Sequence, residues 1–486
     1  MQRCVTRRTV GRVGHGPGDA DSMKAKAIFV GGTSSHAGKS WMTTAICRHL
    51  KQQGFSVAPF KAQNMSNNSF PCSGGGEIGR AQVAQAEACG LAPEPDMNPI
   101  LLKPTSDLGS QVILNGKLFG NVAAQDYYPM HDMLRAEAHN AYNRLRGRFE
   151  YIVIEGAGSI AEMNLKSRDI VNLSMANYAN AQGLLVSDID RGGVFASICG
   201  TLDLLPPQER ALIRSFVVNR FRGDRSLFQD GVEFLEKRTA TPCLGVFPMA
   251  SGILLDAEDG VSLDDVQRQP GSAIAVVRFP HISNFTDFRL LPCQWISRPT
   301  SQPVEWIILP GTKNTIADLH WLRQQGFADW ILEQHRNGTK VLGICGGYQM
   351  LGENIDDPGG VESNGPRSSP GLGLLPVRTI LEKTKVTRVV SAKTPRGHSF
   401  GAYEIHMGQT GNASLPPFAI LEDGVDGARG ERVFGTYLHG ALENPGVLRE
   451  LFGIEIETLP SSTHYDRLAD WFRTSANLPL FKELYL

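Results

Sequence analysis

The first half of the chain alternates short apolar runs with longer stretches of mixed polarity. Runs that are apolar throughout, rather than every second residue, predict strands buried on both faces. Helix-length stretches between them, such as Ser40–Gln53, indicate the crossovers of a parallel sheet. The pattern therefore predicts an α/β domain. The runs are Lys26–Gly32, Ser56–Phe60, Tyr151–Glu155, Gly183–Asp188 and Ser215–Asn219.

A second series of apolar runs follows, at Ile274–Arg278, Trp306–Pro310 and Lys340–Ile344. Between the two series the pattern loosens into prolines and acidic residues, which predicts a connecting region. We therefore expect a first domain over 23–235, a connecting region over 236–272, a second α/β domain over 273–449 and a helical segment over 450–486. The two series share no internal repeat, so they represent two different units in tandem.

Residues 1–22 mix arginines with glycines and contain no apolar stretch of the kind that marks a secretory signal. Met23 stands directly before the first predicted strand. We expect residues 1–22 to be a disordered tail, or the product of a start codon placed too early.

Length, charge and cysteine spacing narrow the class of protein. A chain of 486 residues is too long for one ordinary core, so two or three domains are expected. A formal net charge of −1 argues against a nucleic-acid partner, and no apolar run is long enough to span a membrane. The 8 cysteines include no Cys-x-x-Cys pair, which favours reduced thiols in a cytoplasmic enzyme. Small molecules are the expected partners, with a homodimer as a further expectation.

The segment Gly32–Ser40, G-T-S-S-H-A-G-K-S, lies between a predicted strand and a predicted helix, as a phosphate-binding loop requires. Gly38 would let backbone N–H groups approach phosphate, Lys39 would supply a cation, and the Ser40 hydroxyl would ligate Mg²⁺. Thr33 stands where the usual motif has glycine, so the loop is a variant, and Thr33 is counted among the expected ATP-binding residues. The alternative is a Gly-Lys-Ser sequence that follows a strand by chance.

Glu155 ends the apolar run Tyr151–Glu155 and is followed by glycines. A carboxylate at the carboxyl end of a buried strand faces the crevice where open α/β sheets bind ligands. We expect Glu155 to lie at the metal and phosphate site; a helix cap is the alternative.

Two stretches after the second predicted strand are unusually polar. They are Phe60–Ser69 and Gly74–Gln82, rich in amides, serines and glycines. Such a stretch suits a polar, carboxylate-bearing substrate, although a solvated loop has the same composition.

Cys345 occupies the most specific motif in the chain, the run from Lys340 to Gln349. A predicted strand leads into a tight glycine turn at the cysteine, and a helix follows, which resembles a nucleophile elbow. The helix N-terminus favours a thiolate, and the following N–H groups, Gly346 included, would form an oxyanion hole. A buried core cysteine is the alternative.

A cysteine nucleophile needs a base, and His439 ends a predicted strand between glycines. No acid stands two residues after it, so we predict a Cys345–His439 dyad that works without an orienting carboxylate. Gly311, in a turn after another predicted strand, would offer a second oxyanion N–H. A plain strand-to-helix turn is the alternative for Gly311.

Together these motifs resemble the cobyric acid synthase family, the cobalamin-pathway glutamine amidotransferases. The resemblance runs from Lys26 to Leu451 and includes long polar motifs, so it is specific. Besides Gly32–Ser40 and Ile154–Ser159, the segments that carry it are Pro59–Ser69, Gly75–Gln82, Asp96–Thr105, Asp188–Ser197, Phe221–Asp224, Gly343–Gly352 and Gly435–Gly440.

The resemblance implies a P-loop, dethiobiotin-synthetase-like parallel-sheet domain followed by a class I glutamine amidotransferase-like α/β domain. By motif position it implies ATP and Mg²⁺ as cofactors, with Lys39, Ser40 and Glu155 as phosphate and metal groups. It also implies Glu77 as a second metal acid and Lys61 as a further phosphate or carboxylate contact. The corrinoid branch of the class I domains lacks the acid after the histidine, in agreement with a dyad.

The resemblance also implies the reaction. ATP and L-glutamine would be used to amidate the b, d, e and g carboxylates of adenosylcobyrinic acid a,c-diamide, a corrinoid. Two alternatives stay open at this point. One is cobyrinic acid a,c-diamide synthase, which amidates two carboxylates with the same domains; the other is a P-loop nucleotide switch with an inactive glutaminase domain.

Overall fold

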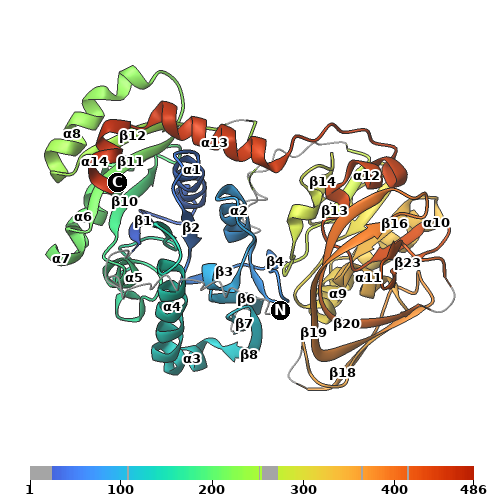
Figure 1. Ribbon diagram of the computed structural model, residues 1–486. Coiled ribbons are helices and arrows are strands. Elements are labelled where there is room, and N and C mark those ends of the chain that lie inside the picture. The colour runs from blue at the N-terminus through green and yellow to red at the C-terminus, as the bar shows by residue number, and fades with distance from the viewer. Residues whose placement is uncertain are drawn as a thin grey trace, which may run out of the picture.

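The two predicted α/β units form two lobes that lie side by side (Figure 1). A computed structural model describes residues 25–106, 109–250, 252, 253, 255, 272–362, 365–412 and 415–486. The expected tail at 1–22, and the part of the expected connecting region at 256–271, lie outside these residues. The predicted α/β class, with a parallel sheet in the first unit, is confirmed.

The N-terminal lobe is built on a six-stranded parallel sheet of order β12-β11-β10-β1-β9-β2. Strands β1 and β9 are mostly apolar and are buried along their length except at the exposed Lys26, because helices cover both faces of the sheet. The strands are β1 (Lys26–Gly32), β2 (Val57–Phe60), β9 (Tyr151–Glu155), β10 (Gln182–Asp188), β11 (Ile213–Phe221) and β12 (Cys243–Pro248).

Helix α1 shows why the chain forms a crossover here. Met42, Ala45, Ile46 and Leu50 fall on one helical face and are fully buried against the sheet. The larger helices of the lobe are α1 (Lys39–Gln52), α2 (Arg80–Ala88), α4 (His131–Arg146), α6 (Val194–Leu204) and α8 (Gln229–Thr239). The short ones are α3 (Ala124–Tyr127), α5 (Leu173–Tyr178) and α7 (Pro207–Arg210).

Strand β12 corrects one expectation. Residues 236–272 were expected to connect the domains, but Cys243–Pro248 instead pairs in parallel with β11 and forms the edge of the first sheet. Edge strands tolerate proline because one side of the strand makes no ladder hydrogen bonds. Pro242 directly precedes this strand and Pro248 is its last residue.

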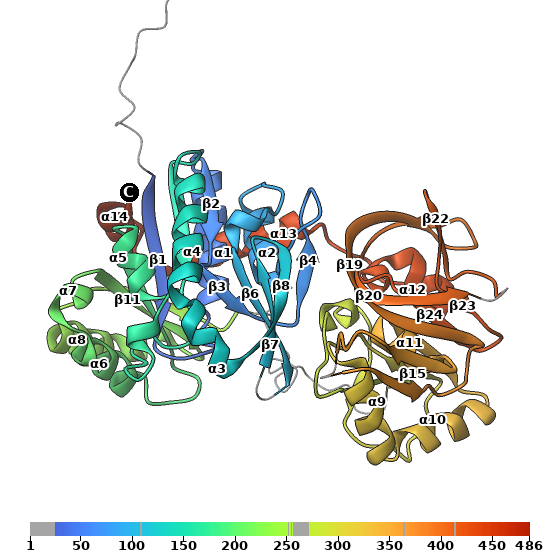
Figure 2. The same cartoon turned by 90° about the horizontal axis from the view of Figure 1, so that it is seen from below.

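The polar stretches that follow β2 build a smaller subdomain at the side of the N-terminal lobe that faces the other lobe (Figures 1 and 2). One sheet has the order β3-β6-β7-β8, and a two-stranded hairpin joins β4 to β5. The strands are β3 (Gln63–Met65), β4 (Ser69–Pro71), β5 (Glu77–Gly79), β6 (Ile100–Ser106), β7 (Gly109–Leu114) and β8 (Lys117–Ala123).

The C-terminal lobe has a second sheet of order β14-β13-β15-β16-β24-β23, parallel except for β23. The strands are β13 (Ile274–Val277), β14 (Gln294–Ile296), β15 (Trp306–Leu309), β16 (Lys340–Ile344), β23 (Ala428–Arg429) and β24 (Val433–Thr436). The helices are α9 (Thr315–Gln324), α10 (Phe327–Arg336), α11 (Gly346–Leu351) and α12 (Pro445–Phe452).

A further mixed sheet covers the same lobe and includes the long antiparallel pair β19 and β20. Its strands are β17 (Asn354–Asp357), β18 (Arg367–Pro370), β19 (Val377–Lys393), β20 (Ser399–Asn412), β21 (Ala419–Leu421) and β22 (Gly424–Asp426). None of the described helices combines the length and apolar character needed to cross a bilayer.

The last two helices return to the N-terminal lobe, where α13 (Ser461–Ser475) lies beside α1 (Figure 1). Phe472 of α13 and Phe481 of α14 (Leu478–Tyr485) are buried in the core of that lobe. The Tyr485 hydroxyl donates to Gly183 O at 3.0 Å and lies 2.7 Å from Ser215 Oγ. The C-terminal segment therefore completes the first sheet's core rather than extending the second lobe.

Candidate active site

The predicted phosphate loop leaves β1 and enters α1, and its backbone requires a glycine at Gly38. Gly38 has φ 101°, a left-handed conformation that disfavours any side chain. A Cβ there would lie 2.1 Å from Asn219 Nδ2, which donates to Ala37 O at 2.9 Å. The loop is thus packed directly onto the end of β11.

Lys39 and Ser40 point to the carboxyl end of the sheet, where the buried strands end. Lys39 Nζ donates to Ser34 O and to Gly158 O, each at 2.9 Å. Ser40 Oγ donates to Glu155 Oε1 at 2.9 Å. The expected strand-end position of Glu155 therefore places its carboxylate against the loop serine.

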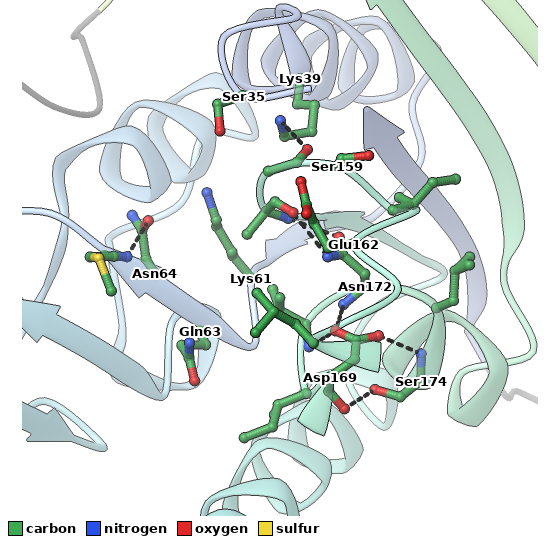
Figure 3. A pocket seen from close by; sticks show the side chains of 18 of the residues that line it. Ser35, Lys39, Lys61, Gln63, Asn64, Ser159, Glu162, Asp169, Asn172 and Ser174 are labelled. Atoms are coloured by element: carbon green, nitrogen blue, oxygen red, sulfur yellow. Dashed lines mark hydrogen bonds between the residues drawn. The ribbon is translucent and has the colours of Figure 1, made fainter. Parts of the chain in front are cut away.

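A cavity of about 630 Å³ opens beside this loop, and Gly38, Lys39, Ser40 and Lys61 line it. Figure 3 shows Lys39 and Lys61 reaching into it from different elements. Thr33 does not line it: its hydroxyl lies 3.0 Å from Ser187 Oγ on β10. The ATP contact predicted for Thr33 is therefore not supported by the position of its hydroxyl, which contacts the neighbouring strand instead.

Glu155 and Ser40 are the oxygen donors that suit Mg²⁺ at this place. Glu155 is fully buried, and Lys61 Nζ and Gln85 also donate to its carboxylate, so the group is held in one position. Among the described residues no three His, Cys, Asp or Glu side chains cluster as a metal site. The oxygen pair fits a cation that takes its remaining ligands from phosphate and water.

Glu77 does not join that pair. Its carboxylate accepts from Lys103 Nζ at 2.9 Å and from Lys385 Nζ, and it does not line the nucleotide-sized cavity. Burial alone would raise the pKa of Glu77, but the two lysine ammonium groups hold that pKa well below its ordinary range. The metal role predicted for Glu77 is not supported by these surroundings, because two cations already neutralise the group.

Cys345 lies in the turn between β16 and α11 with φ 52° and ψ −111°. A non-glycine residue at positive φ is strained, by roughly 1–3 kcal/mol, and such strain clusters at functional sites. The turn is possible because Gly347 and Gly343 approach neighbouring backbone so closely that a Cβ would overlap it. Cys345 is 7% exposed, and the predicted elbow is the geometry observed.

His439 corrects the expectation of a dyad. Its Nδ1 lies 2.8 Å from Asp287 Oδ2, and Asp287 Oδ1 accepts from Gly440 N at 2.7 Å. Both side chains are buried, at 0% and 1% exposure. The orienting carboxylate therefore exists, but it comes from the 3-10 helix Phe285–Phe288 far upstream rather than from the residues after the histidine.

The contact between Asp287 and His439 changes the pKa of the histidine. Burial by itself would lower the pKa of His439, but Asp287 and the neighbouring Cys345 raise it to about 10. An imidazolium at this place can give its proton to a leaving group. His439 Nε2 has no hydrogen-bond partner among the described residues, and the Cys345 thiol donates to Ile405 O at 3.7 Å. His439 Nε2 is the nitrogen that would exchange a proton with the reacting atoms, and no other described residue occupies it.

The two predicted oxyanion glycines lie at the same place. A Cβ on Gly311 would come within 2.9 Å of His439 Cε1, and one on Gly346 within 2.6 Å of Thr312 Cγ2. Either glycine is thus required by close packing around the nucleophile. Their N–H groups remain predicted oxyanion donors.

Several residues around Cys345 escaped prediction. A small cavity beside the thiol is lined by Gln349 and Glu362, whose side chains meet at Thr315 Oγ1 at 3.0 Å and 3.1 Å. Burial raises the pKa of Glu362 to about 7. Gln349 lies in the cysteine motif and offered a signal there, whereas Glu362 is recognisable only from its place in space. The cations that line the same cavity are Lys103, Lys313 and Lys385.

Comparisons with known proteins agree with this division. The profile of the CobQ/CobB/MinD/ParA nucleotide binding domain matches residues 28–263, and that of the CobB/CobQ-like glutamine amidotransferase domain matches residues 273–447. A crystal structure of a glutamine amidotransferase is 18% identical and covers 38% of this chain and 100% of its own, at a TM-score of 0.31. That likeness is too weak to bear on the fold.

Curated relatives match almost the full length. Proteins named cobyric acid synthase from Parabacteroides distasonis and from Dehalococcoides mccartyi strain CBDB1 are each 45% identical, over 93% of this chain and 97% of their own. A third, from Chlorobium phaeobacteroides strain DSM 266, is 44% identical over 95% of this chain and 97% of its own. This chain belongs to the cobyric acid synthase family.

Proposed function

We propose that this chain uses ATP and L-glutamine to amidate the b, d, e and g carboxylates of adenosylcobyrinic acid a,c-diamide, giving cobyric acid. As a member of its family it is a glutamine-hydrolysing, amide-forming ligase of cobalamin biosynthesis. The observation that carries the proposal is the pairing, in one chain, of the Cys345–His439–Asp287 arrangement with a phosphate loop.

The C-terminal lobe supplies the nitrogen. The Cys345 thiolate attacks the side-chain amide carbon of glutamine, and the oxyanion is stabilised by backbone N–H groups at Gly311 and Gly346. His439 donates its Nε2 proton to the departing nitrogen, which leaves as ammonia. Water then attacks the glutamyl thioester with His439 as base, and glutamate is released. Asp287 holds the ring so that Nδ1 stays protonated and Nε2 faces the nucleophile.

The N-terminal lobe activates the acceptor. A substrate carboxylate attacks the γ-phosphate of ATP held by the loop, with Lys39 and Lys61 supplying positive charge to the phosphate oxygens. Ser40 and Glu155 would hold Mg²⁺, which offsets phosphate charge when bound. Ammonia then attacks the acyl phosphate, forms the amide and releases phosphate.

Two features support the remaining parts of the proposal. The described cysteines are all free thiols, which fits a reducing, cytoplasmic compartment. The cavity of about 630 Å³ extends well beyond the loop, to Tyr127, Arg168 and Asp169, and so leaves room for a substrate larger than nucleotide phosphates. A flat, polycarboxylate corrinoid would lie across this opening.

A substrate panel tests the assignment of the acceptor. Purified enzyme is given ATP, glutamine and either cobyrinic acid or its adenosylated a,c-diamide, and products are separated by charge and mass. The proposal expects the diamide to be consumed and the unamidated acid to be left. Consumption of the unamidated acid alone would assign the chain to the a,c-diamide synthase reaction.

The nucleotide-switch alternative has its own test. Steady glutamine hydrolysis that disappears in Cys345→Ser would exclude a switch with an inactive glutaminase. ATP turnover without glutamate release would favour it. The intact Cys345, His439 and Asp287 make the first result the expected one.

A further inference from the structure

Three lysines line the cavity beside Cys345, and two of them share an anionic partner. Lys103 Nζ lies 2.9 Å from Glu77 Oε2, and Lys385 Nζ contacts Glu77 Oε1. Lys313 differs, because it makes no ion pair and no side-chain hydrogen bond with any residue that the structure describes. A cation that is partly removed from water without a counter-charge is unfavourable. The cavity therefore favours a ligand that brings an anion to Lys313.

The charges around Lys313 show that it faces the nucleophile. Burial lowers the pKa of Lys313 most, and the nearby Lys103 lowers it further. Glu362, Glu77 and Cys345 act in the opposite direction. An anion that bound beside Lys313 would favour its charged form in the same way. Lys313 and the thiol thus line one space, and a single small ligand can contact both.

The turn that carries Lys313 is held in place by its neighbours. Lys313 N donates to His281 O at 2.9 Å, and Thr312 Oγ1 donates to the same carbonyl at 3.2 Å. Gly311, whose N–H is a predicted oxyanion donor, stands in the same turn. One turn therefore presents a backbone N–H group and an ammonium group to the same cavity.

A carboxylate of fixed position lines the cavity as well. Glu362 Oε2 accepts from the N–H groups of Thr315 and Ile316 at 2.6 Å and 3.3 Å, and Glu362 Oε1 accepts from Thr315 Oγ1 at 3.1 Å. These donors belong to the first turn of α9, whose positive end favours an anion. Because a carboxylate has about four acceptor positions, Glu362 retains one for a cation in the cavity.

Free glutamine carries both charges that these side chains require. It has an α-carboxylate and an α-ammonium group, and a short aliphatic stem joins them to the side-chain amide. A glutamine whose amide carbon lies at the Cys345 sulfur therefore brings both charges close to the same cavity. A simple amide, or a glutamine side chain within a protein, brings neither charge.

The size of the cavity indicates which part of the wall must move. The enclosed space is about 50 Å³, enough for a few water-sized molecules but less than a whole glutamine occupies. Lys313 is only half-buried and forms no bond that would hold its side chain among the described residues. Its side chain can therefore turn outwards to admit the α-carbon end of glutamine and then contact the carboxylate.

We propose that Lys313 binds the α-carboxylate of glutamine and that Glu362 binds its α-ammonium group. The two side chains then select the free amino acid against other amides, because each rejected amide leaves a charge in the cavity without its partner. This inference rests on the proposed function, since it assumes that Cys345 attacks glutamine.

Analogues that lack one charge test the two contacts separately. Wild type, Lys313→Met and Glu362→Gln receive L-glutamine, γ-aminobutyramide, which has no α-carboxylate, or glutaramate, which has no α-ammonium group. ATP and corrinoid are present, and the carboxylate product is quantified to give KM and kcat. With L-glutamine, each variant should raise KM at least about tenfold, as the loss of a charged hydrogen bond predicts. A loss of binding alone should leave kcat within about threefold of wild type.

The comparison between analogues separates recognition from a structural role. Lys313→Met should change the KM for γ-aminobutyramide less than about threefold, because the contact that it removes is already absent. The same variant should raise the KM for glutaramate at least about tenfold. Glu362→Gln should show the reverse pattern with the two analogues. A side chain that only stabilised the fold would affect all three substrates alike.

Lys385→Met is the matched control, since Lys385 lines the same cavity but already contacts Glu77. Any change that it causes should be equal for L-glutamine and γ-aminobutyramide. Lys313→Arg keeps the positive charge and should restore most of the affinity for L-glutamine. If Lys313→Met does not fold, Lys313→Gln replaces it, with a polar side chain and the same expected pattern. Amidation supported by ammonia should stay within about twofold of wild type in every folded Lys313 variant.

Three results would overturn the proposal. The first is an equal rise in KM for L-glutamine and γ-aminobutyramide in Lys313→Met, and the second is an equal rise for L-glutamine and glutaramate in Glu362→Gln. The third is the same selectivity in Lys385→Met as in Lys313→Met, which would assign carboxylate binding to the general positive charge of the cavity. If wild type hydrolyses no glutamine at all, the proposed function has failed rather than the assignment of these two residues.

Discussion

Asp287 accepts a hydrogen bond from His439 Nδ1 at 2.8 Å across a sequence separation of 152 residues. The same carboxylate accepts from the Gly440 N–H at 2.7 Å, so it fixes both the ring and the backbone that carries it. The histidine that serves Cys345 is therefore oriented by an acid from the first crossover of the C-terminal lobe. The nucleophile, base and orienting acid form a triad.

Replacing Asp287 by asparagine should lower glutamine-dependent turnover by about 10²-fold or more, the usual range for a positioned acid–base group. Amidation with ammonia should be retained, because Cys345 and His439 are then bypassed. Asp423→Asn, at an exposed carboxylate paired with Arg388, is the matched control. Steady-state rates with each nitrogen source give the answer, and equal losses with both sources would contradict the assigned role.

The same variant should change the pH dependence. Asp287 raises the pKa of His439, which is about 10 in the wild type, from an ordinary 6.5. A raised histidine pKa stabilises the fold fully below about 6.5, and this stabilisation is lost as pH rises through about 10. The difference in thermal midpoint between wild type and Asp287→Asn should therefore shrink between pH 7 and pH 10. A difference independent of pH in that range would refute the ion pair.

Gly38→Ala should lower amidation with either nitrogen source, because both reactions need ATP. The residue has φ 101°, and a Cβ would lie 2.1 Å from Asn219 Nδ2, so the loop must distort. We expect ATP affinity to fall at least about tenfold, in line with a strain of roughly 1–3 kcal/mol. Gly200→Ala, in α6 with open space around it, is the control. Calorimetric titration with an ATP analogue measures the effect; unchanged affinity would show that the loop does not bind phosphate.

Tyr485→Phe tests whether the C-terminal segment stabilises the first sheet through the Tyr485 hydroxyl. The change removes the bond to Gly183 O and leaves Ser215 Oγ without its phenol partner. The N-terminal lobe should lose about 1–2 kcal/mol of stability, seen as faster hydrogen exchange in β10 and β11. Exchange in β15 and β16 should not change. Tyr128→Phe, at a half-exposed ring, is the control.

The strands of both sheet cores were predictable from the sequence because they are apolar apart from a charged residue at one end. Lys26–Gly32, Tyr151–Glu155 and Lys340–Ile344 have the predicted bounds. Cys243–Pro248 was missed because an edge strand is only partly buried and tolerates proline, so its pattern resembles a connection. The apolar pattern of a strand reflects how deeply its residues are buried. Strands at the edge of a sheet are the least buried, so their pattern is the weakest.

The residues of the candidate site also differ in how far the sequence alone could predict them. Cys345, His439, Lys39 and Ser40 stand in local turns with recognisable spacing, and the structure brings each pair together. Asp287 has no local signal, since an acid in a short 3-10 helix is common and only the fold brings it to the histidine. The surroundings of Glu77 were not predictable for a related reason: its lysine partner Lys385 comes from the other lobe, 308 residues away.

The most direct test of the two-site account is a count of amides formed by wild type and Cys345→Ser on adenosylcobyrinic acid a,c-diamide. Each step replaces a carboxylate by a neutral amide, so products separate by charge and are identified by mass. The account predicts four new amides from wild type with glutamine or ammonia, and from Cys345→Ser four with ammonia and none with glutamine. Glutamine-dependent amides from Cys345→Ser, or failure of ammonia to rescue it, would contradict the account.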